Sequence, residues 1–341
     1  MLFYKLNAIS PNLSLNMDNA YKYNIIEKLI LQIIKIKVTR WFNSEKALSK
    51  RDNFIKSSKL SPEKTWPNPD KIPQGGEIPF SMQNIKVIGK YLKSCISEGE
   101  IAVKSIKKNN RNTVNVITDQ QLNDFKEYAK TLGVKQIGFT KIPQKLIFKE
   151  RAICYDNTIV LIMEMDKVAI SKAPSIETFK IVFETYDTLG IVTNKLTDYL
   201  RKNNFYAQAS HPLGGLVLYP PLAKKAGLGW LGKHGLLITP QFGSRQRISA
   251  IFTNIENLPL SDNNDHSWIE QFCDKCNKCI RKCPTGAIMD KPIIHESKRQ
   301  THIVRAKCLP YFVNNKGCSI CLKECVFSYS DYYAIKDRFL K

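Results

Sequence analysis

The most regular alternation of apolar and polar positions lies in the middle of the chain. Thr118, followed three residues later by Gln121, has the spacing of a capping box and predicts a helix that runs to about residue 131. Apolar residues at every third or fourth position predict a long helix over residues 176–203. Runs of β-branched and apolar residues predict strands at 133–140, 157–165, 205–210 and 247–255. This mixture indicates an α+β or α/β domain that ends near residue 260.

The first 111 residues carry helical patterns of a different kind. A stripe of Ile25, Ile26, Leu29, Ile30, Ile33 and Ile34 recurs at helical spacing beside several lysines. It predicts a helix that packs on its own domain, with a basic helix lying on a membrane surface as the alternative. Residues 60–79 are rich in proline and predict a loop or linker, while residues 84–106 predict a second helix. The polar run 107–112 then marks a boundary.

Three parts of the chain follow from these patterns. We expect a helical N-terminal extension, a central domain and a cysteine-rich C-terminal domain, with these bounds: 1–112, 113–262 and 263–341. The polar loop 261–267 separates the last two.

Cysteine usage is the strongest chemical signal. Eight of the ten cysteines lie between Cys273 and Cys325. The sequence shows no secretory signal, no twin-arginine pair near its start and no apolar run as long as a membrane span. We therefore expect a cytoplasmic protein whose clustered cysteines bind metal rather than form disulfides. Cys95 and Cys154 have no spaced partners and are expected to be ordinary buried cysteines.

The cysteine spacing is that of a two-cluster ferredoxin. Four cysteines form C-x2-C-x2-C-x3-C directly before Pro284, and in such proteins the fourth cysteine ligates the other cluster. The crossed assignment gives one [4Fe–4S] cluster to Cys273, Cys276, Cys279 and Cys325, and the second to Cys283, Cys308, Cys318 and Cys321. Two structural zinc sites are the alternative, although zinc motifs usually separate two C-x2-C pairs by a dozen residues or more. Val326 stands where a second Cys-Pro would be usual.

The charge is strongly basic but leaves two interpretations open. The formal net charge is +22, from 52 Lys and Arg against 30 Asp and Glu. Half of this excess lies in the first third of the chain and half in the rest, so it is spread along the chain and not concentrated in one basic arm. A polyanionic partner such as RNA, or an acidic redox protein, would account for it. A general lysine-rich bias on solvated faces would do so equally, because no arginine-rich cluster stands out.

A glycine-rich stretch precedes the cysteines and matches G-x-G-x-x-G at Gly227, Gly229 and Gly232. Its context does not fit a dinucleotide-binding fingerprint. The sequence before it predicts a turn and short helix rather than a strand, and the sequence after it predicts strand and loop rather than a long helix. The first acidic residue after it is Glu256, so the usual ribose-binding carboxylate is missing.

The run AGLGWLGKHGLLITPQFGSRQRI followed by CDKCNKCIRKCPTGAI resembles the cobalamin-dependent reductive dehalogenases and their relatives, the epoxyqueuosine reductases of tRNA modification. The likeness covers about residues 116–325. It implies an α+β, nitroreductase-like domain that binds cobalamin without a histidine lower ligand, followed by a ferredoxin-like domain with two [4Fe–4S] clusters. In the family the glycine loop lies against the corrin, which glycine suits because it lets backbone approach closely. The corresponding glycines are Gly227, Gly229, Gly232 and Gly235.

The resemblance also implies catalytic residues. A tyrosine in the long helix donates a proton in the dehalogenases and an arginine after the glycine loop assists, and these fall on Tyr186 and Arg247. Free tyrosine ionises near pH 10, roughly, and a cation close by would make Tyr186 a better acid. Packing on the core face of the helix is the alternative role for Tyr186. The epoxyqueuosine reductases instead carry an aspartate before this tyrosine, where this chain has Thr185, and Asp187 lies one place beyond it.

Three further residues are candidate corrinoid contacts. His211 corresponds to a polar pocket region in the family, with a hydrogen-bonded structural histidine as the alternative. Lys233 and His234 flank the glycine turn and either touch corrin amides or are solvated.

These features together predict an oxidoreductase that receives electrons from a ferredoxin or flavodoxin. Electrons would pass through two [4Fe–4S] clusters to a corrinoid, which reduces a small organic substrate. The missing export signal argues against membrane-linked organohalide respiration. Reduction of epoxyqueuosine in tRNA is one alternative, and an electron carrier without catalysis of its own is the other.

Overall fold

The centre of the protein is a four-stranded antiparallel sheet with the order β2-β4-β8-β5. The computed structural model describes residues 25–64, 82–261, 263–295 and 297–341. The strands are β2 Gln136–Lys141, β4 Asn157–Glu164, β5 Ala207–Ser210 and β8 Gln246–Thr253. All four strands predicted from the sequence are confirmed within a few residues. The observed architecture is a mixed arrangement of helices and antiparallel sheet.

Helices cover this sheet because its central strands are apolar on both faces. In β4, Ile159 and Leu161 pack with α3 (Asp119–Thr131) and α5 (Ile176–Lys202), whereas Val160 and Ile162 face the core that holds α6 (Tyr219–Lys225). Side chains of a strand alternate between faces, so an unbroken apolar run is what a doubly covered strand requires. The capping box of α3 is present, with both hydrogen bonds between Thr118 and Gln121 formed at 3.0 and 3.2 Å.

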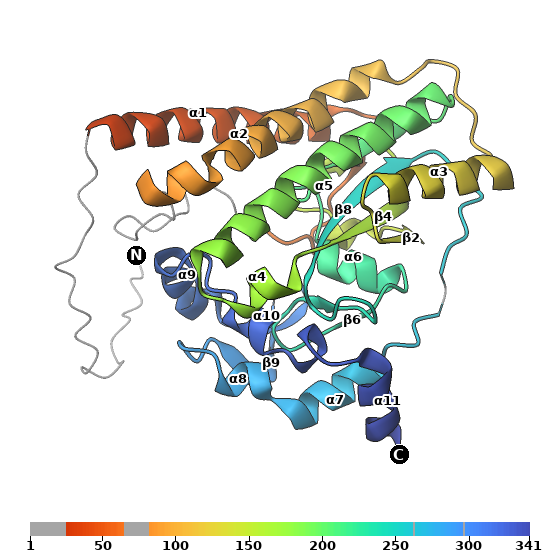
Figure 1. The fold of residues 1–341 in the computed structure, drawn as a ribbon. Coiled ribbons are helices and arrows are strands. Elements are labelled where there is room, and N and C mark those ends of the chain that lie inside the picture. Colours follow the sequence, from red (N-terminus) through yellow and green to blue (C-terminus); the bar gives the residue numbers. More distant parts are fainter. Residues whose placement is uncertain (1–24, 65–81, 262, 296) are drawn as a thin grey trace, which may run out of the picture.

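Two N-terminal helices lie on the outer side of α5. Helices α1 (Ile25–Ala47) and α2 (Met82–Lys104) run side by side, and α2 packs along α5 (Figure 1). Trp41 of α1 is 1% exposed and lies against Gly99, where a Cβ would be 2.2 Å from the indole. A two-residue ladder between β1 (Ile55–Lys56) and β3 (Ala152–Ile153) ties the segment after α1 to the central region.

The helix predicted at α1 is confirmed, but only part of the predicted apolar stripe, including Ile34, packs against the core. Ile25, Leu29 and Ile33 are 77%, 59% and 53% exposed, and the buried face is formed by Val38, Trp41 and the following phenylalanine instead. Bulky aromatic side chains near the end of the helix bury more area than the isoleucines at its start, which sets the rotation of the helix. Most of the proline-rich segment 60–79 lies outside the described residues.

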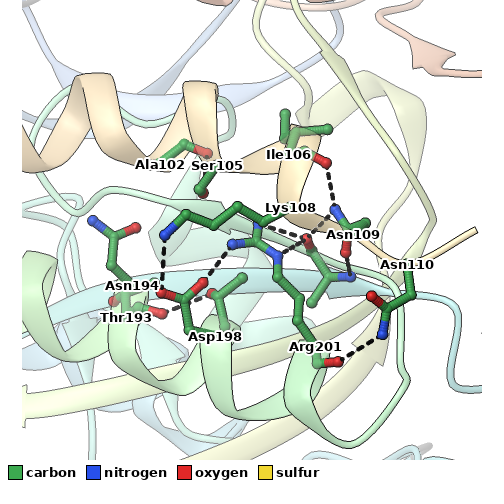
Figure 2. Close-up of polar contacts among 12 residues, drawn as sticks. Ala102, Ser105, Ile106, Lys108, Asn109, Asn110, Thr193, Asn194, Asp198 and Arg201 are labelled. Atoms are coloured by element: carbon green, nitrogen blue, oxygen red, sulfur yellow. Dashed lines mark hydrogen bonds and ion pairs between the residues drawn. The ribbon is translucent and has the colours of Figure 1, made fainter.

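The polar boundary at 107–112 is tied closely to α5. Figure 2 shows Asn109 donating to the carbonyl of Ile106 at 2.9 Å and Asn110 pointing to the carbonyl of Arg201 at 3.4 Å. Asp198 accepts from Arg201 at 2.8 Å and pairs with Lys108 at 3.7 Å. The division of the chain into three domains stays a prediction, and the described N-terminal helices share a core with α5.

The C-terminal region forms a small module at the opposite end of the molecule from α1 (Figure 1). It contains a hairpin and five helices in the described residues: α7 Trp268–Cys276, α8 Lys278–Arg281, β9 Ile288–Ile294, β10 Gln300–Ile303, α9 Arg305–Asn314, α10 Ile320–Glu324 and α11 Tyr332–Leu340. An aromatic core holds it to the rest: Trp268, Phe327 and Tyr332 pack with Trp230 and Ile238 of the glycine-rich stretch.

Two of the shorter features complete the description. The glycine-rich stretch forms a small hairpin of β6 (Trp230–Leu231) and β7 (Leu237–Ile238), and α4 (Lys167–Ser171) precedes α5. None of the helices in the described residues is both long enough and apolar enough to cross a bilayer.

Candidate cofactor and catalytic site

The structure brings together the first predicted set of four thiols, which we name the inner quartet: Cys273, Cys276, Cys279 and Cys325. The pKa of Cys325 is raised to about 12, by burial and, to a lesser extent, by the charges of Cys279 and Cys276. Burial also raises the pKa of Cys273 to about 12, with contributions from Cys325 and the other two. Asn277 has a left-handed backbone, φ 49°, which turns the chain between α7 and α8 so that thiols from both helices converge.

The second set, the outer quartet, is also assembled: Cys283, Cys308, Cys318 and Cys321. Burial raises the pKa of Cys318, and the charges of Cys308 and Cys283 add to this. The same three thiols act on Cys321. Positive φ angles from Lys316 to Ser319 form the tight turn that presents Cys318. Within the described residues, no three Cys, His, Asp or Glu side chains are grouped as a site for one metal ion. The thiols of each quartet lie near enough for their charges to act on one another, and the assignment of one cluster to each quartet stays a prediction.

Cys283 shows how the protein favours a ligating thiolate. Burial pulls its pKa upward, but the hydroxyl of Thr285 and the backbone N–H groups of Thr285, Ala287 and Ile288 outweigh this, and the pKa is lowered. The N–H of Ala287 lies 3.3 Å from the sulfur. Because a cysteine ligates metal only as the thiolate, these donors prepare the sulfur for a cluster.

The glycines of the stretch have roles in its own packing. Gly227 and Gly235 have φ of 73° and 75°, which side-chain-bearing residues rarely adopt. A Cβ at Gly229 would lie 2.1 Å from the carbonyl oxygen of Ile238, and one at Gly232 would lie 2.8 Å from the His234 ring. The close approach of these glycines to a corrin stays a prediction.

His234 presents a buried donor without an acceptor. Its Nδ1 accepts from the N–H of Leu236 at 3.1 Å, and burial lowers its pKa to about 4, so the ring is neutral and carries its proton on Nε2. The residue is 3% exposed, and Nε2 has no partner. Burying an unpaired N–H is costly, so a missing acceptor is implied. A corrin amide oxygen is an acceptor of the required kind, and His234 therefore fits a corrinoid.

The neighbouring Lys233 points elsewhere. Its side chain is 5% exposed, and Nζ bonds Asp290 at 2.7 Å, Asp274 at 3.0 Å and the amide oxygen of Asn277 at 2.9 Å. All three ammonium protons are thus engaged by the cysteine-rich module. Burial alone would lower the pKa of Lys233, but the two carboxylates outweigh it and raise the pKa, so the charge is retained.

Tyr186 and Arg247 meet although they are far apart in the sequence. The guanidinium carbon of Arg247 lies 4.1 Å from the centroid of the Tyr186 ring, which is cation–π geometry. Tyr186 is half-buried on α5 beside the N-terminal aromatic core. Arg247 stands in β8 opposite Met163, and its Nε is buried without a partner. The pair therefore combines a phenolic proton, a positive charge and one unused donor.

His211 is buried between α5 and α1. It is 3% exposed, Gly190 of α5 lies so close that a Cβ there would be 2.0 Å from its Nε2, and Trp41 contacts it edge-on at 5.6 Å. Burial lowers its pKa to about 4, and Nε2 has no partner. Tyr219 donates to its carbonyl oxygen at 2.7 Å. His211 is thus neutral and fixed.

The sequence patterns did not reveal Lys64 and Glu45, which form a buried ion pair near His211. Lys64 bonds Glu45 and the carbonyl of Gly214, and its ammonium lies 4.2 Å from the Phe42 ring centroid. Burial lowers the pKa of Lys64 to about 8. Arg151 contacts the same carboxylate at 3.2 Å. No motif or spacing signals these residues, because they lie in the N-terminal region that carries no recognisable pattern.

Cys95 and Cys154 are buried at 0% and 6% exposure, which confirms the prediction that they are ordinary core cysteines.

Comparison with known proteins adds three findings. A family described as 4Fe-4S binding domain matches residues 266–289. A tetrachloroethene reductive dehalogenase from Desulfitobacterium hafniense is 31% identical over 182 residues, which is 50% of this chain and 32% of that protein. An epoxyqueuosine reductase from Francisella cf. novicida (strain Fx1) is 39% identical over 102 residues, 30% of this chain and 25% of that protein.

A solved structure shares the fold. The catabolic reductive dehalogenase NpRdhA, in complex with 3-bromo-4-hydroxybenzoic acid, superposes with a TM-score of 0.60 at 16% identity, over 85% of this chain and 44% of that one. The chain spans about a third of the length of the D. hafniense dehalogenase that it matches. The likeness therefore covers the helical, sheet and cysteine-rich regions described above but only part of the larger proteins.

Proposed function

Because this chain belongs to the superfamily of the reductive dehalogenases and epoxyqueuosine reductases, we propose that it is a cobalamin- and iron–sulfur-dependent reductase of a small organic substrate. In this assignment each quartet holds a [4Fe–4S] cluster, and His234 is a contact of the corrinoid. When bound, the clusters supply single electrons and the corrinoid supplies the reducing metal centre. A ferredoxin or flavodoxin is the proposed electron donor.

One observation carries the proposal: a single continuous segment joins the inner quartet to the tyrosine–arginine pair. The backbone N–H of Lys233 lowers the pKa of Cys273, and the hydroxyl of Ser244, which also pairs with Ser328 at 2.8 Å, lowers the pKa of Cys325, so both groups lie beside inner thiols. Three residues beyond Ser244, Arg247 lies over Tyr186. A redox group and a proton donor must be close together for reduction coupled to protonation, and this segment supplies the connection.

The roles of the two residues follow from their contacts. Tyr186 donates its phenolic proton to the reduced substrate as general acid. The guanidinium of Arg247 holds the ring in place and puts a positive charge beside the site where the tyrosine oxygen becomes negative. Its unpartnered Nε provides a donor for a polar group of the substrate. Neutral His211 is fixed between α5 and Trp41.

Replacement of Tyr186 tests this function. Tyr186→Phe, reconstituted anaerobically with iron, sulfide and cobalamin, is expected to lose turnover by on the order of 100-fold or more while keeping both cofactors. Tyr199→Phe, on the same helix but packed against Tyr128 at 5.2 Å, is the matched control and should keep its activity. Tetrachloroethene and 3-bromo-4-hydroxybenzoate are the probe substrates, with reduced viologen as donor. Unchanged turnover in Tyr186→Phe would remove this tyrosine from the mechanism.

Cofactor stoichiometry separates the enzyme from a simple electron carrier. The reductase requires about eight irons and one corrinoid per chain after reconstitution. Eight irons without bound corrinoid, shown by metal analysis together with absorbance and spin-resonance spectra, would instead assign the protein as a carrier.

Reduction of epoxyqueuosine in tRNA is the second candidate, favoured by the identity to the Francisella protein and by the basic net charge of +22. The structure gives no replacement for the aspartate of that branch. Thr185 bonds the carbonyl of Ile181, and Asp187 lies near Ser94 of α2 with its Oδ1 buried and without a partner. Burial raises the pKa of Asp187. Conversion of epoxyqueuosine to queuosine in a tRNA stem loop, faster than turnover of either halogenated probe, would make this the function.

A further inference from the structure

Lys233 is a buried cation placed between the glycine-rich hairpin and the cysteine-rich module. Asp274 and Asn277, two of its partners, lie within the C-x2-C-x2-C segment itself, and the third partner, Asp290, stands on β9. The side chain of Lys233 is 5% exposed, whereas those of Asp274 and Asp290 are 63% and 68% exposed. Water therefore screens the carboxylates more strongly than the ammonium.

The same residue also acts on the thiols of the inner quartet. Its backbone N–H lies beside the sulfur of Cys273 and favours the thiolate there, and the charge of its side chain favours the thiolate of Cys279. Both effects stabilise negative charge on the sulfurs. Reduction adds one negative charge to a cluster, and the potential of a cluster depends on nearby charge and on hydrogen bonds to its sulfurs. A buried cation at this place favours the reduced form.

We propose that Lys233 is a positioning and tuning residue for the inner cluster: it clamps the glycine-rich hairpin to the cluster-binding segment and raises the reduction potential of that cluster. The inference rests on the cluster assignment of the proposed function and not on the identity of the substrate. It assigns Lys233 to the electron path, and leaves the contact with the corrinoid to His234.

The potential of the inner cluster is the readout, because a merely structural role would not move it. The full chain is loaded with iron and sulfide but not with cobalamin, and both midpoint potentials are measured by redox titration with spin-resonance detection. Lys233→Gln is expected to shift the potential of the inner cluster to a more negative value and to leave the potential of the outer cluster unchanged. The reduced fraction of the inner cluster at the wild-type midpoint potential should therefore fall several-fold. Lys291→Gln, an exposed lysine on β9, is the matched control for loss of one charge and should shift neither.

Two more variants separate charge from folding. Lys233→Arg keeps the charge and should keep the inner potential near the wild-type value, even where the planar guanidinium fits the three acceptors less well. Asp290→Asn should shift the inner potential in the opposite direction, to a less negative value, because Lys233 remains held by Asp274 and Asn277 while one carboxylate is removed.

The outcomes are distinct. Unchanged potentials in Lys233→Gln with full iron content would overturn the proposal. If that variant does not load clusters, a potential in Asp290→Asn that is equal to wild type or more negative would overturn it. Because no step requires corrinoid or substrate, failure here leaves the proposed reductase untouched, whereas absence of two clusters from the wild type would refute the cluster assignment instead.

Discussion

The inner and outer quartets are alike in composition but differ in what bonds their sulfurs. Cys273 and Cys325 of the inner quartet lie beside the backbone N–H of Lys233 and the hydroxyl of Ser244, which lower their pKa and belong to the segment that leads to Arg247. Cys283 of the outer quartet accepts its bonds from Thr285, Ala287 and Ile288 within the cysteine-rich module itself. One quartet is therefore joined to the candidate catalytic region, and the other is supported by its own loop.

This difference gives a direction to the proposed electron path. An electron would enter at the outer quartet, pass to the inner quartet and reach the region of Tyr186 and Arg247. The two quartets lie near each other, since the charge of Cys279 acts on the buried thiol of Cys321. A donor protein would then dock on the side of the outer quartet.

Removal of an inner ligand should have the largest effect. Cys325→Ala is expected to retain about four irons per chain and to lower the melting temperature, because cluster binding contributes to folding and Cys325 belongs to the core shared with Ile238 and Trp268. Iron analysis and thermal unfolding measure both. Cys318→Ala should lose the same amount of iron with a smaller fall in melting temperature. An equal fall in both variants would contradict the difference between the quartets.

The crossed assignment predicts which variants behave alike. Cys283→Ala should remove the outer cluster, so its remaining spin-resonance spectrum should match that of Cys318→Ala and differ from that of Cys273→Ala. A spectrum like that of Cys273→Ala would show that Cys283 completes the set of its own motif, and the two quartets would have to be reassigned.

Acid should lower the free energy of unfolding of the protein, because the buried ring of His234 must remain neutral in the folded state. Its pKa is about 4 in the folded chain and about 6.5 when unfolded, so between these values the unfolded state binds more protons and stability falls as the pH is lowered. The contribution of neutral His234 to the free energy of unfolding is present above about pH 6.5. About 2 kcal/mol of this free energy is lost between pH 7 and pH 5. Denaturant unfolding at both pH values measures this. His234→Asn, which keeps an acceptor for Leu236, should reduce the loss, and an unchanged pH dependence would argue against a neutral buried His234.

The smallest effects should come from single hydrogen bonds to sulfur. Ser244→Ala removes a donor to Cys325, and Thr285→Val removes one to Cys283. Each bond is worth about 1 kcal/mol, or on the order of 40 mV for a one-electron couple. Ser244→Ala should make only the inner potential more negative, and Thr285→Val only the outer one. If both variants shift the same potential, the sulfurs are not partitioned as described.

Much of the secondary structure could be predicted because its causes are local. The capping box of Thr118 and Gln121, the period of α5 and the apolar run of β4 depend on neighbours within a few residues, and all are confirmed. The facing of α1 could not be predicted. Periodicity shows that a helix has an apolar stripe, but it does not show which stripe a distant partner such as Gly99 will cover.

The candidate site divides in the same way. Cysteine spacing alone determined the kind of cofactor, because four thiols at short fixed intervals suit a cluster. Lys233 and His234 are adjacent in the turn between β6 and β7, and only the fold decided that the first meets Asp290 while Nε2 of the second is buried without a partner.

The sequence by itself determined the order of the elements, the cluster chemistry of the tail and the glycines that the hairpin requires. The tertiary structure decided which groups meet: Arg247 over Tyr186, Ser244 at Cys325, and Lys64 with Glu45 in a buried pair that no motif signals. The physical reason is that strand register and helix packing set distances between residues many positions apart, whereas turn geometry, periodicity and ligand spacing act within a few residues of the chain.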